Sequence, residues 1–369
     1  MRLHRVLFTA LALVPTTLVA HADRITLVDG TELKDVEIQL ESLQTVTYEE
    51  DGDETSVASH KVRSVEFDRY PPLVDEALSA LRGGDAALAV DLLDAYIEEA
   101  GDRGGRRGFK WAPPFAAWTA IELRQQFGDL AGVTSGSAAF LTKFPDSRYV
   151  PYVYLTKASA EGVLGQASKV TQTLGAFRAL IGEKDLSSRW DFEVDLAEAR
   201  AAGGSLATQR AALEEIVSKA KAEHPGVASR AQVAIGEAIL AEAEKKQGSD
   251  KDKAATLRRE AQSMFEEIVG DATSDDATLA GAYTGLGECY FYAGADAQDP
   301  ELLKKAVLAL LRLPVSYETQ TAYVPKALFL AGRSFDMLQD NGRKSAMLRQ
   351  LEQQYPNNPW TEQGRKFLR

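Results

Sequence analysis

The sequence is poor in the residues that most often build reactive sites. Cys289 is its single cysteine, and only two of its four histidines, His60 and His224, follow residue 22. One cysteine cannot form an internal disulfide, and a zinc site needs several Cys or His ligands at close spacing. No Gly-x-Ser-x-Gly elbow, Walker loop or dinucleotide fingerprint is present either. The sequence therefore predicts a protein that is not an enzyme and that uses no metal and no cofactor.

Positive charge is also in short supply. Lysine and arginine total 42 against 54 acidic residues, which gives a formal charge of -12 and no electrostatic basis for general nucleic-acid binding. One basic segment, residues 103–111, contains Arg106 and Arg107 beside Phe109 and Trp111. These two arginines are candidates for gripping an acidic partner. The alternative, which the acidic composition favours, is a solvated loop tethered to the core by Trp111.

Acidic residues cluster on one predicted helix at Asp191, Glu193, Asp195 and Glu198. A general acid–base pair would need two carboxylates on one face, whereas three of these fall on different faces. A solvated helix surface is the favoured interpretation.

Long apolar runs are missing except at the start of the chain. Arg2 and Arg5 precede the apolar run Val6–Val14, and Ala20-His21-Ala22 has the small-x-small form of a signal-peptidase site. We expect residues 1–22 to be a signal peptide and the protein to be exported, most simply to the periplasm. Secretion to the medium and retention by an uncleaved anchor are the alternatives. No later segment is apolar enough for a transmembrane helix.

Residues 23–69 alternate apolar and polar side chains with the period of β-strands. Asp29-Gly30 and Asp51-Gly52 are two-residue hairpin signals between these short strands. The pattern predicts a small all-β barrel domain. Its first hairpin, residues 25–36, resembles that of Src-homology-3-like and Sm-like barrels.

From residue 73 to 369 the pattern becomes helical, and one segment is especially informative. Tyr283, Leu286 and Tyr290 recur on one helix face, Gly287 allows a partner helix to approach, and Gly294 is expected to end the helix. This aromatic-x-x-Leu-Gly-x-x-Tyr-x-x-x-Gly pattern resembles the first helix of a tetratricopeptide repeat. The resemblance implies a mainly α fold, a superhelix of stacked helix pairs that binds other proteins.

Helix pairs recur about every 40 residues, and a last helix is placed to cap the array. The predicted segments are 73–99, 114–144, 149–181, 188–223, 227–269, 277–313 and 321–355, followed by the cap 361–368. Two junctions, residues 144–149 and 355–360, share the form aromatic-Pro-Asx-Ser/Asn. This arrangement resembles tetratricopeptide proteins of the bacterial envelope. The chain lacks the lipid-attachment cysteine and the coiled coil of particular members, so neither of those specific roles is implied.

Aromatic residues on predicted first helices mark candidate positions for partner binding. Trp118, Tyr152 and Tyr154 are such residues, because first helices line the concave surface of tetratricopeptide arrays. Packing in the core is the alternative role for each of them. The leading functional hypothesis is an exported, non-catalytic scaffold that binds a protein partner of the cell envelope. The alternative is a protein that binds cell wall, glycan or peptide through its N-terminal β domain.

Overall fold

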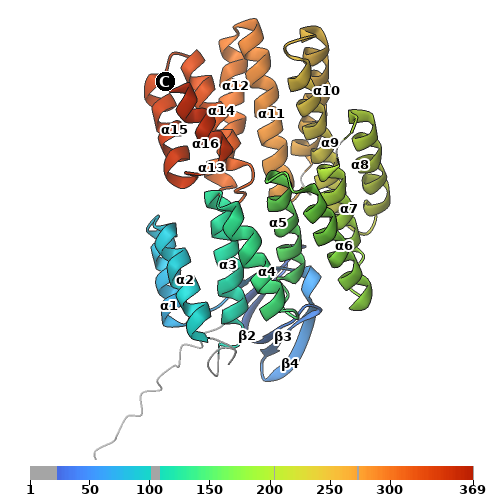
Figure 1. Cartoon of the computed structure of the whole chain (residues 1–369), viewed down its shortest axis with the longest axis vertical. Coiled ribbons are helices and arrows are strands. Elements are labelled where there is room, and N and C mark those ends of the chain that lie inside the picture. Colours follow the sequence, from blue (N-terminus) through green and yellow to red (C-terminus); the bar gives the residue numbers. More distant parts are fainter. Residues whose placement is uncertain (1–22, 101–108, 203, 272–273, 369) are drawn as a thin grey trace, which may run out of the picture.

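The computed structural model describes residues 23–100, 109–202, 204–271 and 274–368. The predicted signal peptide, residues 1–22, and the candidate residues Arg106 and Arg107 lie outside the described residues. In Figure 1 a small β-sheet lies at one end of the molecule, and helices arranged as successive hairpins make up the rest. None of the described helices is long and apolar enough to cross a membrane.

The described N-terminal strands form one antiparallel sheet with the order β4-β3-β2-β1-β5. Both predicted hairpin turns are present, and Gly30 and Gly52 have the positive φ angles, 86° and 90°, that such turns require. The strands are β1 (Asp23–Leu27), β2 (Glu32–Glu41), β3 (Thr45–Glu50), β4 (Asp53–Ala58) and β5 (Val62–Glu66), with the short helix η1 (Ser59–Lys61) before β5.

The sequence predicted a small β-barrel, whereas the structure shows an open sheet. Strands β4 and β5 are its two edges and are not paired with each other. The physical reason lies in β4 and in the neighbouring helices. Residues 53–56 of β4 are all exposed, so this strand has little apolar surface to fold over the sheet. The buried face of the sheet instead shares one apolar core with the first helices, where Phe67 stacks on Trp111.

The described helices after the sheet form seven pairs, close to the segments that the sequence predicted. Proline at the first turn and aspartate or asparagine caps start many of these helices. The helices are α1 (Pro72–Arg82), α2 (Ala86–Ala100), α3 (Ala112–Phe127), α4 (Leu130–Lys143), α5 (Val150–Val163), α6 (Ala167–Glu183), α7 (Arg189–Ala201), α8 (Leu206–Ala220), α9 (Pro225–Lys246), α10 (Lys251–Gly270), α11 (Asp276–Ala297), α12 (Pro300–Leu310), α13 (Arg312–Ser316), α14 (Val324–Met337), α15 (Asn341–Gln354) and the final α16 (Pro359–Phe367).

The first helices of the pairs form the inner side of a curved array. Helix α7 contacts both α5 and α9, and α11 contacts both α9 and α14. The second helices pack mainly against their own partner and the next first helix. Because neighbouring first helices touch while the second helices are spread apart, the array curves with its first helices inside.

The glycines of the tetratricopeptide-like segment act mainly through packing. A Cβ at Gly287 would lie 2.5 Å from Leu310 Cγ, so the predicted close approach of a partner helix is confirmed. The prediction for Gly294 was wrong, because α11 continues to Ala297. A Cβ at Gly294 would lie 3.0 Å from Leu303, which shows that this glycine admits α12 rather than ending α11.

The sheet contacts the starts of several first helices. Arg148, just before α5, forms a buried ion pair with Glu41 of β2, and burial raises the pKa of Glu41 although Arg148 opposes the rise. Arg189 of α7 donates to the His60 carbonyl oxygen at 2.8 Å, and Arg63 of β5 pairs with Asp276 of α11. The sheet therefore fixes the positions of α5, α7 and α11 relative to one another.

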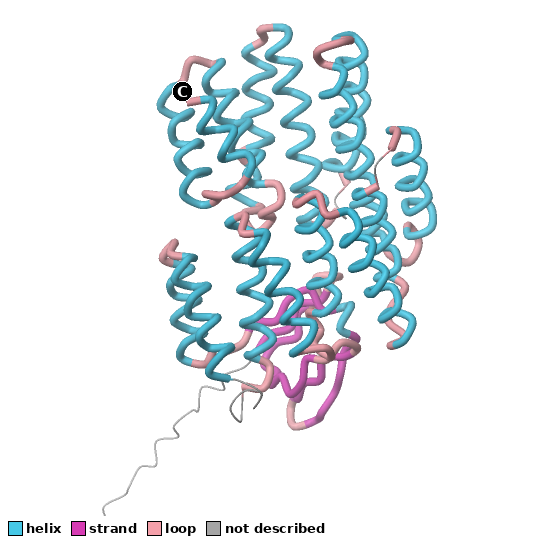
Figure 2. The backbone as a smooth tube through the Cα atoms, in the orientation of Figure 1, coloured by secondary structure: helices cyan, strands magenta, loops and turns pink. Residues whose placement is uncertain are grey.

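The two ends of the array also meet. Figure 2 shows the C-terminal helices lying above the N-terminal ones, so the chain completes about one turn of a superhelix. A Cβ on Gly128, in the turn between α3 and α4, would lie 2.8 Å from the carbonyl oxygen of Asn357, between α15 and α16. The last repeat thus rests on the second one.

Candidate functional site

Charged side chains from four first helices line the inside of the array. We call this set the inner face, and it consists of Glu193 and Arg200 of α7, Arg230 and Glu237 of α9, Glu288 of α11 and Lys326 of α14. Within α7 and within α9, the two members stand seven residues apart. Seven residues are about two helical turns, so both members project from the same side of their helix.

Ion pairs link α7 to α9 at one end of the inner face. Arg230 forms an ion pair with Glu193 and a second one with Asp275 at 3.0 Å. Arg189 also approaches Glu193, with its Nε 3.7 Å from Oε1. Burial acts to lower the pKa of Arg230, but Glu193 and Asp275 outweigh it, so the pKa is raised and the guanidinium stays charged.

Tyr323 contacts a second ion pair between α7 and α9, formed by Arg200 and Glu237. Arg200 lies 3.2 Å from Glu237, and the Tyr323 hydroxyl hydrogen-bonds with both side chains. Burial raises the pKa of Tyr323, and the Glu237 carboxylate raises it further. Arg200 keeps 39% of its side chain exposed, so solvent reaches this group although protein surrounds it. The charges here are open to a ligand.

Lys326 and Glu288 form the third link, between α14 and α11, with Nζ 2.5 Å from Oε2. Burial acts to lower the pKa of Lys326, but the Glu288 and Glu237 carboxylates raise it overall. The Lys326 ammonium also lies 5.5 Å from the centre of the Trp360 ring of α16. The Lys326 ammonium therefore stays charged.

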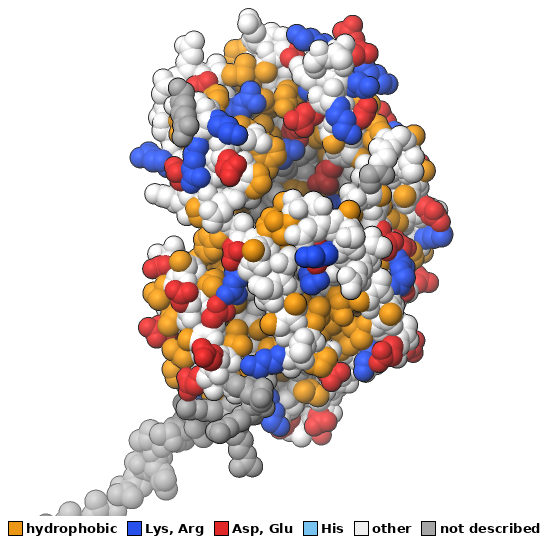
Figure 3. All heavy atoms as spheres, in the orientation of Figure 1, with side chains coloured by type: hydrophobic (Ala, Val, Ile, Leu, Met, Phe, Trp, Pro, Cys, Tyr) orange, Lys and Arg blue, Asp and Glu red, His pale blue; other side chains and the backbone are white. Residues whose placement is uncertain are grey.

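Two hollows adjoin these ion pairs. One is a pocket of about 120 Å³ between α9, α11 and α14, lined by Glu237, Glu288 and Lys326 among others. The other is an opening of about 780 Å³ between α5, α6 and α7, whose lining is mostly small and apolar but includes Glu193 and Arg200. Figure 3 shows that the molecule is hollowed at mid-height, with charged side chains inside the hollow. The charged side chains of the inner face thus lie beside hollows whose lining is partly apolar.

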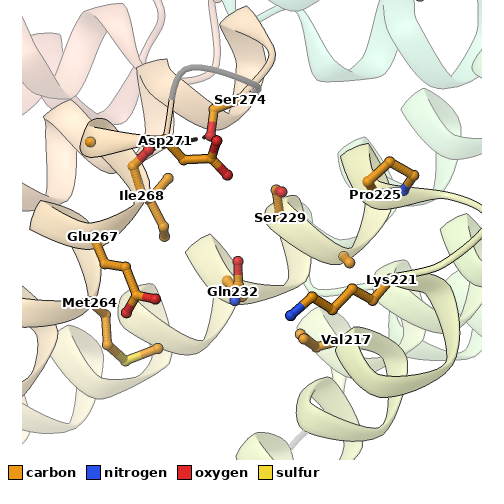
Figure 4. Close-up of a pocket in the computed structure, with 12 residues that line it drawn as sticks. Val217, Lys221, Pro225, Ser229, Gln232, Met264, Glu267, Ile268, Asp271 and Ser274 are labelled. Carbon is orange, nitrogen blue, oxygen red and sulfur yellow. Dashed lines mark hydrogen bonds between the residues drawn. The ribbon is translucent and has the colours of Figure 1, made fainter.

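A third hollow, of about 540 Å³, lies between α8, α9 and α10 (Figure 4). Lys221, which directly follows α8, and Glu267 of α10 stand on opposite walls, and Gln232 lies between them. No ion pair joins the two charged groups in the part of the chain that the structure describes. This hollow is the space left where two second helices spread apart, and its polar groups do not converge on one point.

The structure brings two of the three predicted aromatic residues together. Trp118 of α3 stacks on Tyr149 at 6.0 Å and lies 6.1 Å from Tyr152 of α5. Tyr152 in turn meets Trp190 of α7 edge-on, at 5.2 Å. Trp118 and Tyr152 are partly exposed, whereas Tyr149 and Trp190 are buried, and together the four rings form a row across successive first helices. The predicted role of Trp118 and Tyr152 in partner binding stays a prediction.

Tyr154 points elsewhere. Its ring stacks on Phe177 of α6 at 5.1 Å, and Phe177 is fully buried. Tyr154 therefore packs within its own helix pair and does not join the row formed by Trp118 and Tyr152.

The acidic cluster on α7 divides between two environments. Arg178 of α6 forms ion pairs with Asp195 at 2.7 Å and Glu198 at 3.1 Å, both on half-exposed side chains. That part fits a solvated surface. Glu193 differs, because its side chain is largely buried against Arg230 and belongs to the inner face. The interpretation of the whole cluster as solvated was wrong for this residue.

The inner-face charges were missed in the sequence, although a signal for them exists. Glu193/Arg200 and Arg230/Glu237 each have opposite charges seven residues apart on predicted first helices. Only the pairing of first helices across the array shows that these charges meet. No group of three or more His, Cys, Asp or Glu side chains in the described ranges is arranged to hold a metal ion.

Comparisons with known proteins do not assign the chain to a family. No protein-family model matches it, and no curated protein matches it. One solved structure that it resembles is the apo form of the quorum sensor NprR from B. thuringiensis, at 14% sequence identity and a TM-score of 0.39. The match covers 80% of this chain and 79% of that one. A likeness at this TM-score carries no argument about function.

Proposed function

We propose that the protein is a non-catalytic scaffold whose inner face binds a segment of a protein partner. One observation carries the proposal: charged side chains from α7, α9, α11 and α14 converge inside the curved array beside hollows of about 780 and 120 Å³. A helical array with a filled interior would need no such charges. Arg200 and Glu237 are half-exposed, so they stay available to a partner.

The tetratricopeptide type of the repeats and the destination of the chain belong to this proposal. The pattern at residues 283–294 supports the repeat type, and the N-terminal pattern at residues 2–22 supports export. An exported scaffold meets its clients in the cell envelope, so we propose an envelope protein as the partner, with the periplasm as the place of binding.

Site-specific photo-crosslinking in cells tests the proposal. A photoreactive amino acid is placed at Ala241, which lines the small inner pocket, or at Ala255, an exposed alanine on the second helix α10. We expect a discrete crosslinked partner from position 241 but not from position 255. Glu237→Lys should abolish it, because it reverses a charge on the inner face. The same set of crosslinked proteins from both positions would contradict the proposal.

A further inference from the structure

The sixth helix pair carries apolar and basic side chains on the exposed side of α12 and α13. We call this set the α12–α13 stripe, and it consists of Lys305, Leu308, Leu311, Arg312 and Val315. Leu308 is 70% exposed and Val315 is 78% exposed, the two highest values among the large apolar side chains that the structure describes. Leu311, where α12 meets α13, keeps helical backbone angles, with φ -70° and ψ -14°. Residues three, four and seven positions apart therefore share one side of this segment.

The two cations of this stripe lack an acidic partner. Neither Lys305 nor Arg312 forms an ion pair among the residues that the structure describes. Lys305 lies 5.9 Å from the centre of the Tyr290 ring, and Arg312 lies 4.7 Å from that of Tyr283. The whole chain has a formal charge of -12, so an exposed set of apolar and unpaired basic side chains is unusual in it. Such a set fits an occupant with apolar and acidic side chains.

Helix α2, in the first pair, has such side chains on its exposed side. We call this set the α2 stripe, and it consists of Leu88, Asp91, Leu92, Ala95 and Glu98. Leu88 is 44% exposed, and α2 contains no lysine or arginine. Asp91 and Glu98 pair with no cation in the part of the chain that the structure describes. Figure 3 shows acidic and apolar side chains gathered where α1 and α2 lie.

The two stripes match in spacing as well as in charge. Asp91 and Glu98 are seven residues apart, and so are Lys305 and Arg312. The apolar residues of each stripe recur at alternating intervals of three and four, as the a and d positions of a coiled coil do. In that register the two acids occupy g positions and the two cations occupy e positions, which pair between parallel helices. We propose that the α2 stripe of one copy of the chain docks on the α12–α13 stripe of a second copy.

This contact joins different surfaces of the two copies. One stripe of each copy stays free, so further copies can add until the assembly closes into a ring or grows as an open chain. Each stripe presents only a few side chains, so the contact is small and the association is weak. Both stripes lie on second helices, whereas the inner face lies on first helices. The inference therefore does not depend on what the inner face binds.

Sedimentation velocity of the purified chain, from about 1 µM to about 1 mM, tests the inference. We expect the average mass to rise with concentration and not to level off at two copies. Lys305→Glu with Arg312→Glu should weaken the association about tenfold or more, because like charges then face each other. Asp91→Lys with Glu98→Lys should have the same effect. A chain with all four changes should associate again, because the two stripes have then exchanged their charges.

Lys253→Glu with Arg259→Glu is the matched control. It makes the same change in net charge at two exposed positions of α10, and neither residue forms an ion pair in the described ranges. We expect this variant to associate as the unchanged protein does. All these positions are exposed, so each variant should keep the melting temperature of the unchanged protein within a few degrees.

Several results would overturn the inference. The mass of one chain at every concentration would refute it, and so would a variant with all four changes that failed to associate. Levelling at two copies would show a symmetric contact in its place. The stripe would instead meet an anionic lipid surface if the chain stayed single but bound phosphatidylglycerol vesicles, and Lys305→Glu with Arg312→Glu abolished that binding.

Discussion

Two glycines leave room for one aromatic ring to pack between three helices, α9, α10 and α11. Phe265 of α10 is fully buried, and its ring lies between Gly236 of α9 and Gly285 of α11. A Cβ would lie 2.5 Å from this ring at Gly236 and 2.3 Å from it at Gly285, closer than real contacts allow. This contact holds α9 and α11 at the spacing that places Glu237 opposite Glu288.

The packing of Phe265 predicts that Gly285→Ala is destabilising. Any shift of the ring disturbs a well-packed core, so we expect a loss of about 1–3 kcal/mol in the free energy of unfolding, measured by urea denaturation. Gly175→Ala is the control, because Gly175 lies in the exposed part of α6 with no atom within 4 Å of its would-be Cβ. That change should stabilise the protein by about 0.5–1 kcal/mol. Equal effects of the two changes would refute the packing argument.

For single residues, the sequence predicts some structural roles well and others not at all. The close approach at Gly287 follows from a recognisable pattern within one helix. The packing of Gly236 on Phe265 involves different helices, so no local pattern reveals it. The inner-face charges are partly predictable. Their seven-residue spacing is visible in the sequence, but the residues with which they pair are not.

The helices and strands themselves are well specified by local chemistry. Asp129, Asp250, Asp275 and Asn358 each cap a helix by accepting a backbone N–H bond, and proline starts several others. Such signals are local, so the helix pairs are found where the sequence predicts them. The predicted barrel is an open sheet in the structure, because closure depends on which elements cover the sheet, and here helices share its core.

At the junction between η1, α7 and α9, the structure brings together two histidines that are distant in the sequence. His60 follows β4, and His224 precedes α9 and bonds to the Ser188 hydroxyl at 2.9 Å. Burial lowers the pKa of His60, and Arg189, Lys61 and His224 lower it further. Burial also lowers the pKa of His224, against the opposing effects of Glu223 and Glu193.

These lowered pKa values predict a pH-dependent stability. The unfolded chain binds the protons more readily, near the ordinary histidine pKa of about 6.5, so folding stability is full above that value and falls as pH decreases below it. We expect the melting temperature to drop between about pH 8 and about pH 5.5. The drop should be smaller in a His60→Gln, His224→Gln double variant. Equal drops in the two proteins would show that other groups cause the effect.

The curvature of the whole array determines how close the side chains of the inner face lie to one another. The sheet fixes the starts of α5, α7 and α11, and the last repeat rests on the second through Gly128 and Asn357. Neither constraint is visible in the sequence, because each joins residues more than a hundred positions apart. Together they hold the first helices around one hollow, which keeps the charges of the inner face close to one another.

The contact at Gly128 predicts that the ends of the array separate when a side chain is added there. Gly128 has a φ of 77° and Gly165 a φ of 72°, so alanine is strained at either position by about 1 kcal/mol. Only at Gly128 would the new Cβ also press on Asn357. We therefore expect Gly128→Ala to lose about 1–3 kcal/mol more stability than Gly165→Ala.

The same change should alter the shape of the molecule. Once Asn357 is pushed away, the amide hydrogens of Asn357 and Asn358 should exchange faster, and small-angle scattering should give a larger radius of gyration than for Gly165→Ala. Binding at the inner face should weaken in parallel, because α14 carries Lys326 and moves with the last repeat. If Gly128→Ala and Gly165→Ala behaved alike in exchange and scattering, the two ends would not hold each other and the sheet alone would set the curvature.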